Sequence, residues 1–485
     1  MRSTAKLYAY QGLTTAVNLL FPFFSFPYLT RVLGIEALGA VNYVDYLAQF
    51  FIGIALFGTP LYIVRNTASL RHSKARTQAL FEQLFTLRLT LGLLATIGFL
   101  GALLMFTEIH VPYTLIALGG LNVLVSGMQT EPFLQGIKSF LFIGWRTAII
   151  KLCTLLALYI FVRDPQDLVV YYLILVLAVA ATVFTDLLFL RAQQKLTISF
   201  SNRTKAHLKP LSIFAGISAC IALYYSAGVY LLSLSSGVAA VGLFTTVLKF
   251  QSHFQVIIRD AGLVGLPHIS SYLAAGHQVQ RGLLQQKTEL MFFVALPLCC
   301  LLSLFAPQLL LLFAGPTFQI GVPLLRSMAF LPLLTGLSNV FGIQGLLGIG
   351  AEKHLLKAVA MGSLVFVLLC GLLFLFPGAQ TLAWLLLLVE SVVCLAAYYH
   401  LHRSIQFHVP IPAWMRQTIL CVILYAIILF LNDSTPVPAN IKVVGGSILF
   451  LTFYITINKY LWQEPALVNL SRAFQSLLTS KRNFP

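Results

Sequence analysis

Charged residues are scarce in this sequence, and the acidic ones are the scarcest. Only 9% of the 485 residues are charged, with 14 Asp and Glu against 31 Lys and Arg, whereas 59% are hydrophobic. Soluble globular domains carry about 25% charged residues. The composition therefore excludes an ordinary water-soluble domain and indicates that a lipid bilayer is the solvent of most of the chain.

Short motifs of several enzyme classes are absent. The sequence contains no G-x-x-x-x-G-K-[ST], no His-Glu-x-x-His and no Gly-x-Ser-x-Gly. These absences exclude an ATP-driven pump of the P-loop type and give no support to a zinc peptidase or a serine hydrolase. The seven cysteines lie in apolar segments without a Cys-x-x-Cys spacing, so neither a disulfide framework nor a zinc site is predicted. No cofactor is expected.

Long apolar segments account for most of the chain. A helix needs about 20 apolar residues to cross the hydrocarbon core of a bilayer, and such segments follow one another here with only short connectors between them. The pattern predicts an all-α integral membrane protein with about fourteen transmembrane helices. The predicted segments are 9–30, 41–64, 87–107, 112–134, 147–162, 167–190, 210–232, 239–258, 288–313, 321–348, 358–376, 380–400, 416–431 and 441–458.

Basic residues mark one side of the membrane. Lys and Arg gather in the two tails and in several connectors, together with Lys138 and Arg146. Because basic residues favour cytoplasmic loops, this side is predicted to be cytoplasmic, with both termini on it. Lys151 is interpreted as reaching from the cytoplasmic end of its helix to the headgroups. The basic connectors are 65–88, 191–209, 259–287, 353–357 and 403–416.

The formal net charge of +17 invites comparison with proteins that bind nucleic acid. Its concentration on one side of the membrane is what the topology alone requires, and it also attracts anionic lipid headgroups. Membrane lipids are therefore expected partners, and nucleic acid is not.

Two pairs of segments resemble each other at nearly the same separation. Gln-Gly dipeptides at 135–136 and 344–345 lie 209 residues apart, and PYLTRVLGIEALGAV resembles VYLLSLSSGVAAVGL 202 residues later. A period of six helices returns the chain to the same side, so the halves would be parallel copies around a central cavity. The predicted parts are 1–208 (first six-helix lobe), 209–403 (second six-helix lobe) and 404–485 (two additional helices and a cytoplasmic tail).

Two predicted helices carry polar residues on one face. An ionisable residue at mid-bilayer costs about 2.5–3.5 kcal/mol, so these faces are expected to line a hydrated cavity. Asp45 and Lys249 lie nearly one repeat apart, which predicts either an ion pair across the cavity or a mutual neutralisation that locks the closed state. The polar residues are Asn42, Asp45 and Gln49 in the second predicted helix, and Lys249, Ser252 and His253 in the eighth.

Three more ionisable residues lie in or beside apolar segments. Arg31 and Arg326 are predicted near the outer half of the membrane, where a guanidinium can bind phosphate in a bidentate manner or reach the headgroups. Glu390, within LLLLVESVVCLA, is the most isolated acid. It is a candidate site for a coupling ion, H+ or Na+, or else a protonated residue in a helix interface.

Four segments follow one another in a familiar order: FPYLTRVLGIEALGAVNYV, EPFLQGIKSF, GLPHISSYLAAG and GPTFQIGVPLLRSMAFLPLLTGLSNVFGIQGLLGIGAEK. Their order and spacing resemble the O-antigen (Wzx-type) polysaccharide-transport flippases of the MOP exporter superfamily, over about residues 1–400. The resemblance implies a MATE-like, two-lobed bundle that moves an undecaprenyl-diphosphate-linked oligosaccharide from the cytoplasmic to the periplasmic leaflet by alternating access. It also implies a bacterial inner membrane and, as partners, the proteins that polymerise and assemble the polysaccharide.

The resemblance gives the polar residues expected roles. Lys249, Arg326 and Arg31 would compensate the negative charge of the diphosphate. Related lipid II flippases use basic residues for this purpose, including some on the eighth helix, which carries Lys249 here, although the surrounding residues do not match closely. The residues expected to hydrogen-bond the sugars are Asn42, Gln49, Ser252, His253 and Asn339.

Two other functions stay open at this point. A cation-coupled multidrug exporter of the same superfamily would be expected to have a mostly aromatic, weakly charged cavity. A membrane polysaccharide polymerase or ligase would need acid and base residues on sizeable outer loops, whereas the outer connectors here are short. A transporter, not an enzyme, is therefore the preferred prediction.

Overall fold

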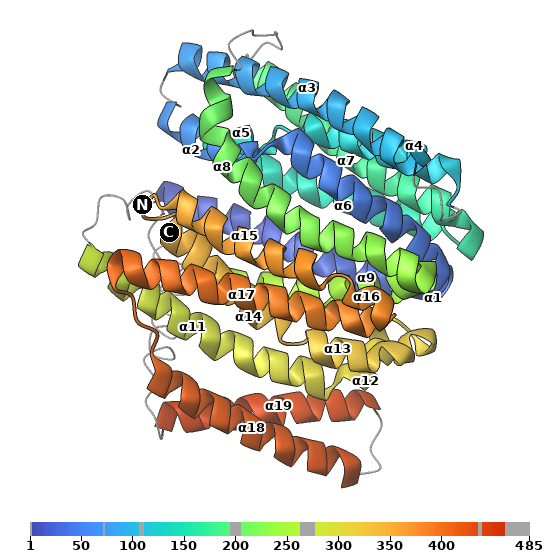
Figure 1. Cartoon of the computed structure of the whole chain (residues 1–485), viewed down its shortest axis with the longest axis vertical. Coiled ribbons are helices and arrows are strands. Elements are labelled where there is room, and N and C mark those ends of the chain that lie inside the picture. The colour runs from blue at the N-terminus through green and yellow to red at the C-terminus, as the bar shows by residue number, and fades with distance from the viewer. Residues whose placement is uncertain are drawn as a thin grey trace. The chain divides into compact units, whose positions relative to one another are not determined.

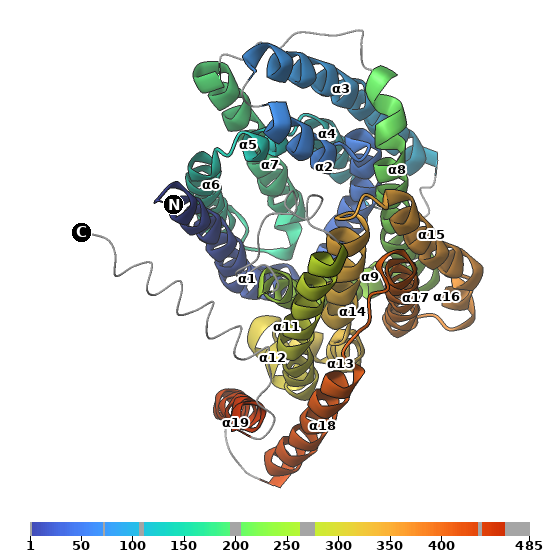
Figure 2. The same cartoon turned by 90° about the vertical axis from the view of Figure 1, so that its left-hand side faces the viewer.

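The chain is helical wherever the structure describes regular elements. A computed structural model covers the chain (Figures 1 and 2), and the described residues are 2–70, 73–105, 111–194, 205–261, 277–434 and 439–460. In lipid every backbone N–H and C=O needs a partner within the protein, and a helix supplies one for each residue of its interior. The prediction of an all-α membrane protein is confirmed.

The helices differ widely in length. Up to residue 261 they are α1 (Arg2–Leu56), α2 (Thr59–Leu70), α3 (Lys74–Met105), α4 (Tyr113–Gly127), α5 (Glu131–Gly136), α6 (Phe140–Phe161), η1 (Pro165–Asp167), α7 (Leu168–Gln194), α8 (Lys205–Ala222), η2 (Leu223–Ala227) and α9 (Gly228–Ala261). Those that follow are α11 (His277–Leu304), α12 (Ala306–Phe313), η3 (Pro316–Gly321), α13 (Val322–Met328), α14 (Leu331–Ser338), η4 (Asn339–Leu346), α15 (Glu352–Leu369), α16 (Leu372–Leu375), α17 (Ala379–Ile405), α18 (Ile411–Ser434) and α19 (Ala439–Tyr460).

Ten of the described helical runs are long and apolar enough to cross a membrane, or eleven if the bent pair Pro316–Met328 and Leu331–Leu346 forms one span. Each of the predicted segments overlaps a described helix. The number of candidate spans is lower than the fourteen predicted segments for two reasons. α1 and the run His207–Gln255 each contain two predicted segments, and α4 is only 15 residues long. Fourteen spans therefore remain a prediction, and a multi-pass membrane fold is established.

The internal repeat is visible in the backbone of the two longest helices. α1 is kinked at Gly34 (φ 73°, ψ −175°), and α9 is kinked at Gly237 (φ 78°, ψ 178°). The two positions are 203 residues apart, within the separations read from the sequence. Positive φ is accessible to glycine at little cost, so the same residue type produces the same bend at both places.

α1 and α9 approach each other closely at two places, and the residues involved are again 203 residues apart. A Cβ added at Gly39 would overlap the backbone carbonyl of Val238, and a Cβ added at Gly242 would overlap the backbone carbonyl of Ile35. The pairs Gly39 with Gly242 and Ile35 with Val238 are each 203 residues apart. The contact is therefore reciprocal, with each copy of the repeat supplying one glycine and one carbonyl.

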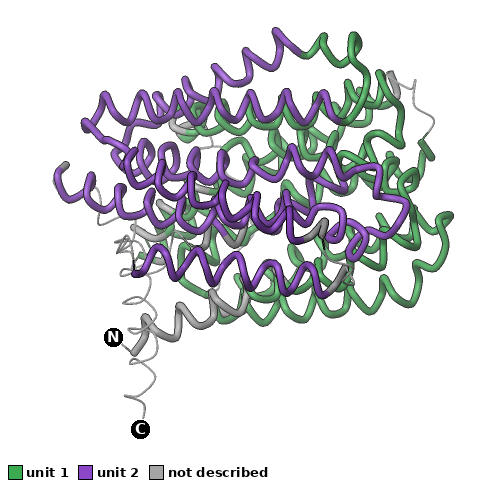
Figure 3. Tube along the Cα trace, turned by 90° about the horizontal axis from the view of Figure 1, so that it is seen from below, with its two compact units in different colours: residues 1–245, 370–379 green, residues 246–369, 380–485 purple. Residues whose placement is uncertain are grey.

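Internal contacts divide the chain into two compact units, which Figure 3 shows in different colours. α8 falls in unit 1, where Gly58 approaches its backbone at Phe214. The predicted lobe boundaries at residues 208 and 403 remain predictions. Unit 1 comprises Met1–Thr245 and Cys370–Ala379, and unit 2 comprises Thr246–Leu369 and Gln380–Pro485.

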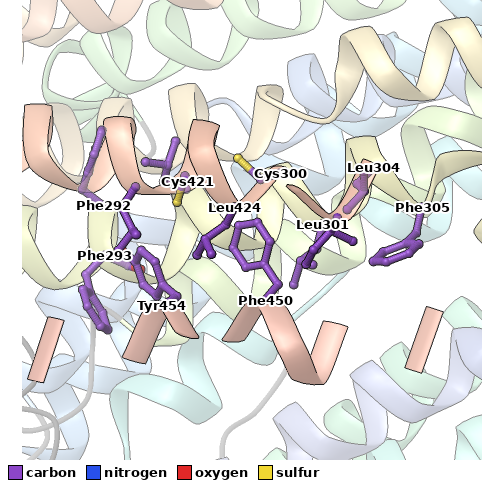
Figure 4. Close-up of a cluster of buried hydrophobic side chains, with 13 residues drawn as sticks. Phe292, Phe293, Cys300, Leu301, Leu304, Phe305, Cys421, Leu424, Phe450 and Tyr454 are labelled. Carbon is purple, nitrogen blue, oxygen red and sulfur yellow. The ribbon is translucent and has the colours of Figure 1, made fainter. Parts of the chain in front are cut away.

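The last two helices belong to the core of unit 2. In Figure 4, side chains of α11, α18 and α19 form one buried apolar cluster. The rings of Phe292 and Trp414 stack with centroids 4.3 Å apart, and the Tyr454 hydroxyl donates a hydrogen bond of 3.1 Å to the carbonyl of Phe293. α18 and α19 are thus packed on α11 through buried contacts.

Candidate functional site

Three basic residues that the sequence analysis assigns to the cytoplasmic surface are buried inside helices. Arg88, Arg146 and Lys287 are only 2%, 6% and 3% exposed. Their placement in connectors is wrong because α3 and α11 begin 14 and 10 residues before Arg88 and Lys287, and α6 begins six residues before Arg146. The cytoplasmic side of these residues stays a prediction. Cations at such depth require partners, which differ among the three.

Arg146 stands at the centre of a buried ion triad in unit 1. Its Nη1 pairs with Oδ1 of Asp186 on α7, and its Nη2 lies 2.7 Å from Oε2 of Glu131 on α5. Gln135 donates a 3.0 Å hydrogen bond to the other Glu131 oxygen. The side chains of Arg146 and Asp186 are 4% and 1% exposed, and that of Glu131 is 36% exposed. One guanidinium therefore joins three helices.

Arg88 contacts the break between α4 and α5, which interrupts the predicted membrane segment 112–134. α4 ends at Gly127 and α5 begins at Glu131. The Nη2 of Arg88 donates a 3.4 Å hydrogen bond to the carbonyl of Ser126, while Arg88 Nε has no hydrogen-bond partner among the described residues. A cation is favourable at the carbonyl end of a helix. Arg88 thus stabilises a helix end that would otherwise expose carbonyls within the membrane.

Lys151 lies midway along α6, so its predicted position just inside a helix end is wrong, and the headgroup contact stays a prediction. Eleven residues separate it from Phe140 and ten from Phe161. Its Nζ lies 4.2 Å from the centroid of the Phe21 ring on α1. Lys151 is half-buried and forms no ion pair with a residue in the described ranges. The position of Lys151 in the middle of an apolar run of the sequence could have indicated this location.

Asn42 and Asp45, which were predicted to share one polar face, have different surroundings on α1. Asn42 is 2% exposed and donates a 2.8 Å hydrogen bond to Thr245 on α9, 203 residues away. Asp45 is half-buried, and its charge acts on the phenols of Tyr171 and Tyr172 on α7. Asn42 therefore serves the helix contact of the repeat, whereas Asp45 belongs to a polar cluster with two tyrosines.

Lys287 is held in unit 2 by side-chain amides. Its Nζ donates a 2.7 Å hydrogen bond to Oε1 of Gln344, and Nε2 of Gln344 donates a 3.1 Å hydrogen bond to Oδ1 of Asn339. Both amides lie in η4, a π-helical stretch, and π-helical segments are frequent at functional sites. Gln344 therefore links the predicted residue Asn339 to Lys287, a cation that was predicted to lie in a connector.

The predicted residues of the eighth segment lie together on α9. Lys249, Ser252 and His253 are all half-buried. The Ser252 hydroxyl donates a 2.7 Å hydrogen bond to the carbonyl of Lys249 in its own helix. Lys249 and His253 stay predicted binding residues.

The remaining candidates differ in their exposure. Arg31 is exposed and donates a 2.8 Å hydrogen bond to the carbonyl of Pro27 in its own helix. Arg326 is exposed in the last turn of α13, and Gln49 is exposed on α1. Glu390 is buried in α17, with 5% exposure, and its ion-coupling role remains a prediction. The ion pair of Asp45 with Lys249 also remains a prediction, since the two residues belong to different units.

No group of three or more His, Cys, Asp or Glu side chains is arranged to hold a metal ion within the described ranges. The seven cysteines are all free thiols. The chemistry available in these ranges is therefore that of buried cations, carboxylates, amides and phenols.

Comparisons with known proteins give one family and two similar transporters. A model of the family described as polysaccharide biosynthesis protein matches residues 6–273. A protein from Escherichia coli (strain K12) named as an O-antigen transporter is 24% identical over 369 residues, covering 74% of this chain and 87% of that protein. A protein of the same description from Shigella dysenteriae is 24% identical over 391 residues, covering 79% of this chain and 96% of its own length.

Solved structures show the same fold. The lipid II flippase MurJ in an inward closed conformation aligns with a TM-score of 0.60 and 12% identity, over 94% of this chain and 99% of that one. An outward-facing MATE multidrug transporter of the MOP superfamily aligns with a TM-score of 0.57 and 17% identity, over 82% and 93% of the two chains. The prediction of a MATE-like fold is confirmed.

Proposed function

The chain belongs to the polysaccharide biosynthesis protein family, and from this premise we propose that it flips a lipid-linked oligosaccharide across the bacterial inner membrane. It is a multi-pass membrane transporter of the MOP superfamily, not an enzyme. The proposed substrate is an undecaprenyl-diphosphate-linked repeat unit of O-antigen or another surface polysaccharide. Transport would proceed from the cytoplasmic to the periplasmic leaflet by alternating access, with both termini of the chain in the cytoplasm.

The observation that carries this proposal is Lys151. A cation at the centre of a membrane helix costs about 2.5–3.5 kcal/mol, and a contact with an aromatic face returns about 0.5–2 kcal/mol. Lys151 has the aromatic contact with Phe21 but no ion pair in the described part of the chain. A transient anion would offset the remaining cost, and the diphosphate of the lipid carrier is such an anion.

Other residues remain candidates for contacts with a charged, hydroxylated headgroup. Lys249, Arg326 and Arg31 remain proposed contacts of the diphosphate, and His253, Gln49 and Asn339 remain proposed contacts of the sugars. Asn42 and Ser252 are weaker candidates, because their described hydrogen bonds serve helix packing. The polyprenyl tail can stay in the lipid while the headgroup crosses. Binding at each contact has to remain modest so that the headgroup is released.

Translocation by the purified chain tests the proposal. We expect proteoliposomes that contain only this protein to translocate a fluorescent undecaprenyl-diphosphate oligosaccharide. Lys151→Ala is expected to reduce the rate about tenfold, which corresponds to about 1.4 kcal/mol, whereas Lys151→Arg should retain part of it and Lys249→Ala should reduce it less. Lys353→Ala, at an exposed position of α15, is the matched control and should leave the rate unchanged.

Different outcomes would favour the other functions. Extrusion of small organic cations without translocation of the oligosaccharide would favour a cation-coupled multidrug exporter. Polymerised product without translocation would favour a membrane polymerase or ligase. Full activity of Lys151→Ala at normal abundance in the membrane would remove Lys151 from the substrate path.

A further inference from the structure

We propose that the triad of Arg146, Glu131 and Asp186 is a proton-binding site, with the proton held on Oδ2 of Asp186. The triad joins α5, α6 and α7 within unit 1. It is separate from Lys151, from the polar residues of α9 and from Glu390. The site itself does not depend on the identity of the transported molecule.

The charges of the triad do not balance. One guanidinium faces two carboxylates, so the group carries a formal charge of −1 when both acids are ionised. Arg146 and Asp186 are almost fully buried, and an uncompensated charge in such a place is strongly unfavourable. One proton brings the formal charge of the triad to zero.

The hydrogen bonds identify the oxygen that takes the proton. Both Glu131 oxygens accept hydrogen bonds, from Gln135 and Arg146, and Oδ1 of Asp186 accepts one from Arg146. Oδ2 of Asp186 is buried and accepts none from a residue that the structure describes. A metal cation of the Ca²⁺ or Mg²⁺ type requires several oxygen ligands, whereas a proton requires one. The geometry therefore favours a proton over a metal ion.

The surroundings of Asp186 support the same assignment. α7 packs against α1, α4, α5 and α6. The charged groups that act on Asp186 are Arg146 of α6 and Glu131 of α5, and in the described ranges α1 and α4 contribute none. Asp186 is sealed, but the Glu131 side chain is 36% exposed.

Proton binding would change how α7 is held. With Asp186 ionised, Arg146 bridges α7 to α6 and α5. With Asp186 protonated and neutral, the pairing of Arg146 with Glu131 remains and the attachment of α7 to it weakens. If the proposed transport function is correct, this proton-sensitive contact supplies the coupling ion, H+, and places it in unit 1 and not at Glu390.

Thermal unfolding as a function of pH tests the site without any transport assay. A proton held by the folded protein but not by the unfolded chain makes stability fall as the pH rises. Asp186→Asn imitates the protonated form, so its Tm should equal that of the parent at low pH and exceed it by about 2–4 °C at high pH. Glu131→Gln should also flatten the pH dependence, because a balanced ion pair remains. Glu36→Gln, at an exposed position of α1, should follow the parent throughout.

Two results would overturn the site. If Asp186→Asn unfolds at lower temperature than the parent at every pH, the triad is a permanently ionised structural contact. If its Tm changes with pH as steeply as that of the parent, no proton is held there. Infrared difference spectra give an independent check, since a carboxylic acid band should appear on acidification of the parent and be missing in Asp186→Asn.

Transport measurements then address coupling. In proteoliposomes with an imposed pH gradient, the parent should move the oligosaccharide faster than without the gradient, and Asp186→Asn should lose this difference. An equal response of parent and variant to the pH gradient, or a response to a Na+ gradient alone, would exclude coupling through Asp186. Proton binding in the unfolding assay without any translocation by the parent would leave the site intact and refute the transport function instead.

Discussion

In each unit a buried cation lies beside an irregular helical segment, and the group that accepts its hydrogen bond differs between the units. In unit 1, Arg88 of α3 donates to a backbone carbonyl at the end of α4. In unit 2, Lys287 of α11 donates to the amide of Gln344 in a π-helical stretch. The two cations are 199 residues apart, close to the repeat separation. In both units a buried cation donates a hydrogen bond near an irregular helical segment, where backbone groups need partners, and the acceptors differ.

A second difference concerns carboxylates. Arg146 in unit 1 is paired with two acids across helices, and the described acceptor of Lys287 in unit 2 is a neutral amide. Unit 1 therefore depends on the balance of charges at this triad, and removal of its shared cation should be costly.

The largest effect is expected for Arg146→Leu. This change leaves Glu131 and Asp186 without their shared partner, and unpairing a buried charge costs about 3–5 kcal/mol. We expect most of the protein to be lost from the membrane or to unfold at markedly lower temperature, as measured by detergent-solubilised thermal unfolding. Arg76→Leu removes an exposed arginine of α3 and serves as the control. Near-normal stability of Arg146→Leu would contradict the dependence of unit 1 on charge balance.

An intermediate effect is expected where the two copies of the repeat touch. Gly39→Ala and Gly242→Ala each place a methyl group against a backbone carbonyl, and such overpacking typically costs about 1–3 kcal/mol. Because the contact is shared, the double variant should lose less than the sum of the single losses. Gly101→Ala, where a Cβ meets nothing within 4 Å, should be neutral or stabilising. Additive losses would show that the two approaches are independent.

The smallest effect is expected for Arg88→Met, in comparison with Lys287→Met. Lys287→Met removes a 2.7 Å hydrogen bond to Gln344, and leaving that buried oxygen without a donor costs about 1–3 kcal/mol. Arg88→Met removes a longer bond of 3.4 Å and a buried cation, so its loss should be smaller, below about 1 kcal/mol. Both values come from thermal unfolding of the same preparation. The reverse order would show that the end of α4 depends on Arg88 more than its geometry indicates.

The helices and the repeat could be predicted because they rest on patterns that extend over many residues. Apolar runs of about 20 residues identify membrane helices, and the same glycines recur at Gly34 and Gly237 to produce equal kinks. Gln135 and Gln344, which helped to identify the repeat, each donate a hydrogen bond to a neighbouring polar side chain. Predictions from such patterns stay correct when the predicted helix boundaries are wrong by a few residues.

The buried cations could not be placed because their assignment depends on helix ends. A basic residue just before an apolar run is normally a loop residue, and this rule misplaced Arg88 and Lys287, whose helices begin three or four turns earlier. Asp186 did carry a signal, since it interrupts the apolar run TVFTDLLFL. Its partner Arg146 is 40 residues away in sequence, so only the packing of α6 on α7 brings them together.

The reciprocal approach of Gly39 and Gly242 also limits how the gene that encodes this chain can evolve. After a duplication, each copy is normally free to accumulate its own substitutions. Here a larger residue in either copy damages the surface against which the other copy packs. At this crossing two segments that lie one repeat apart restrict the size of each other's residues, and the sequence should change there more slowly than along the lipid-facing helices.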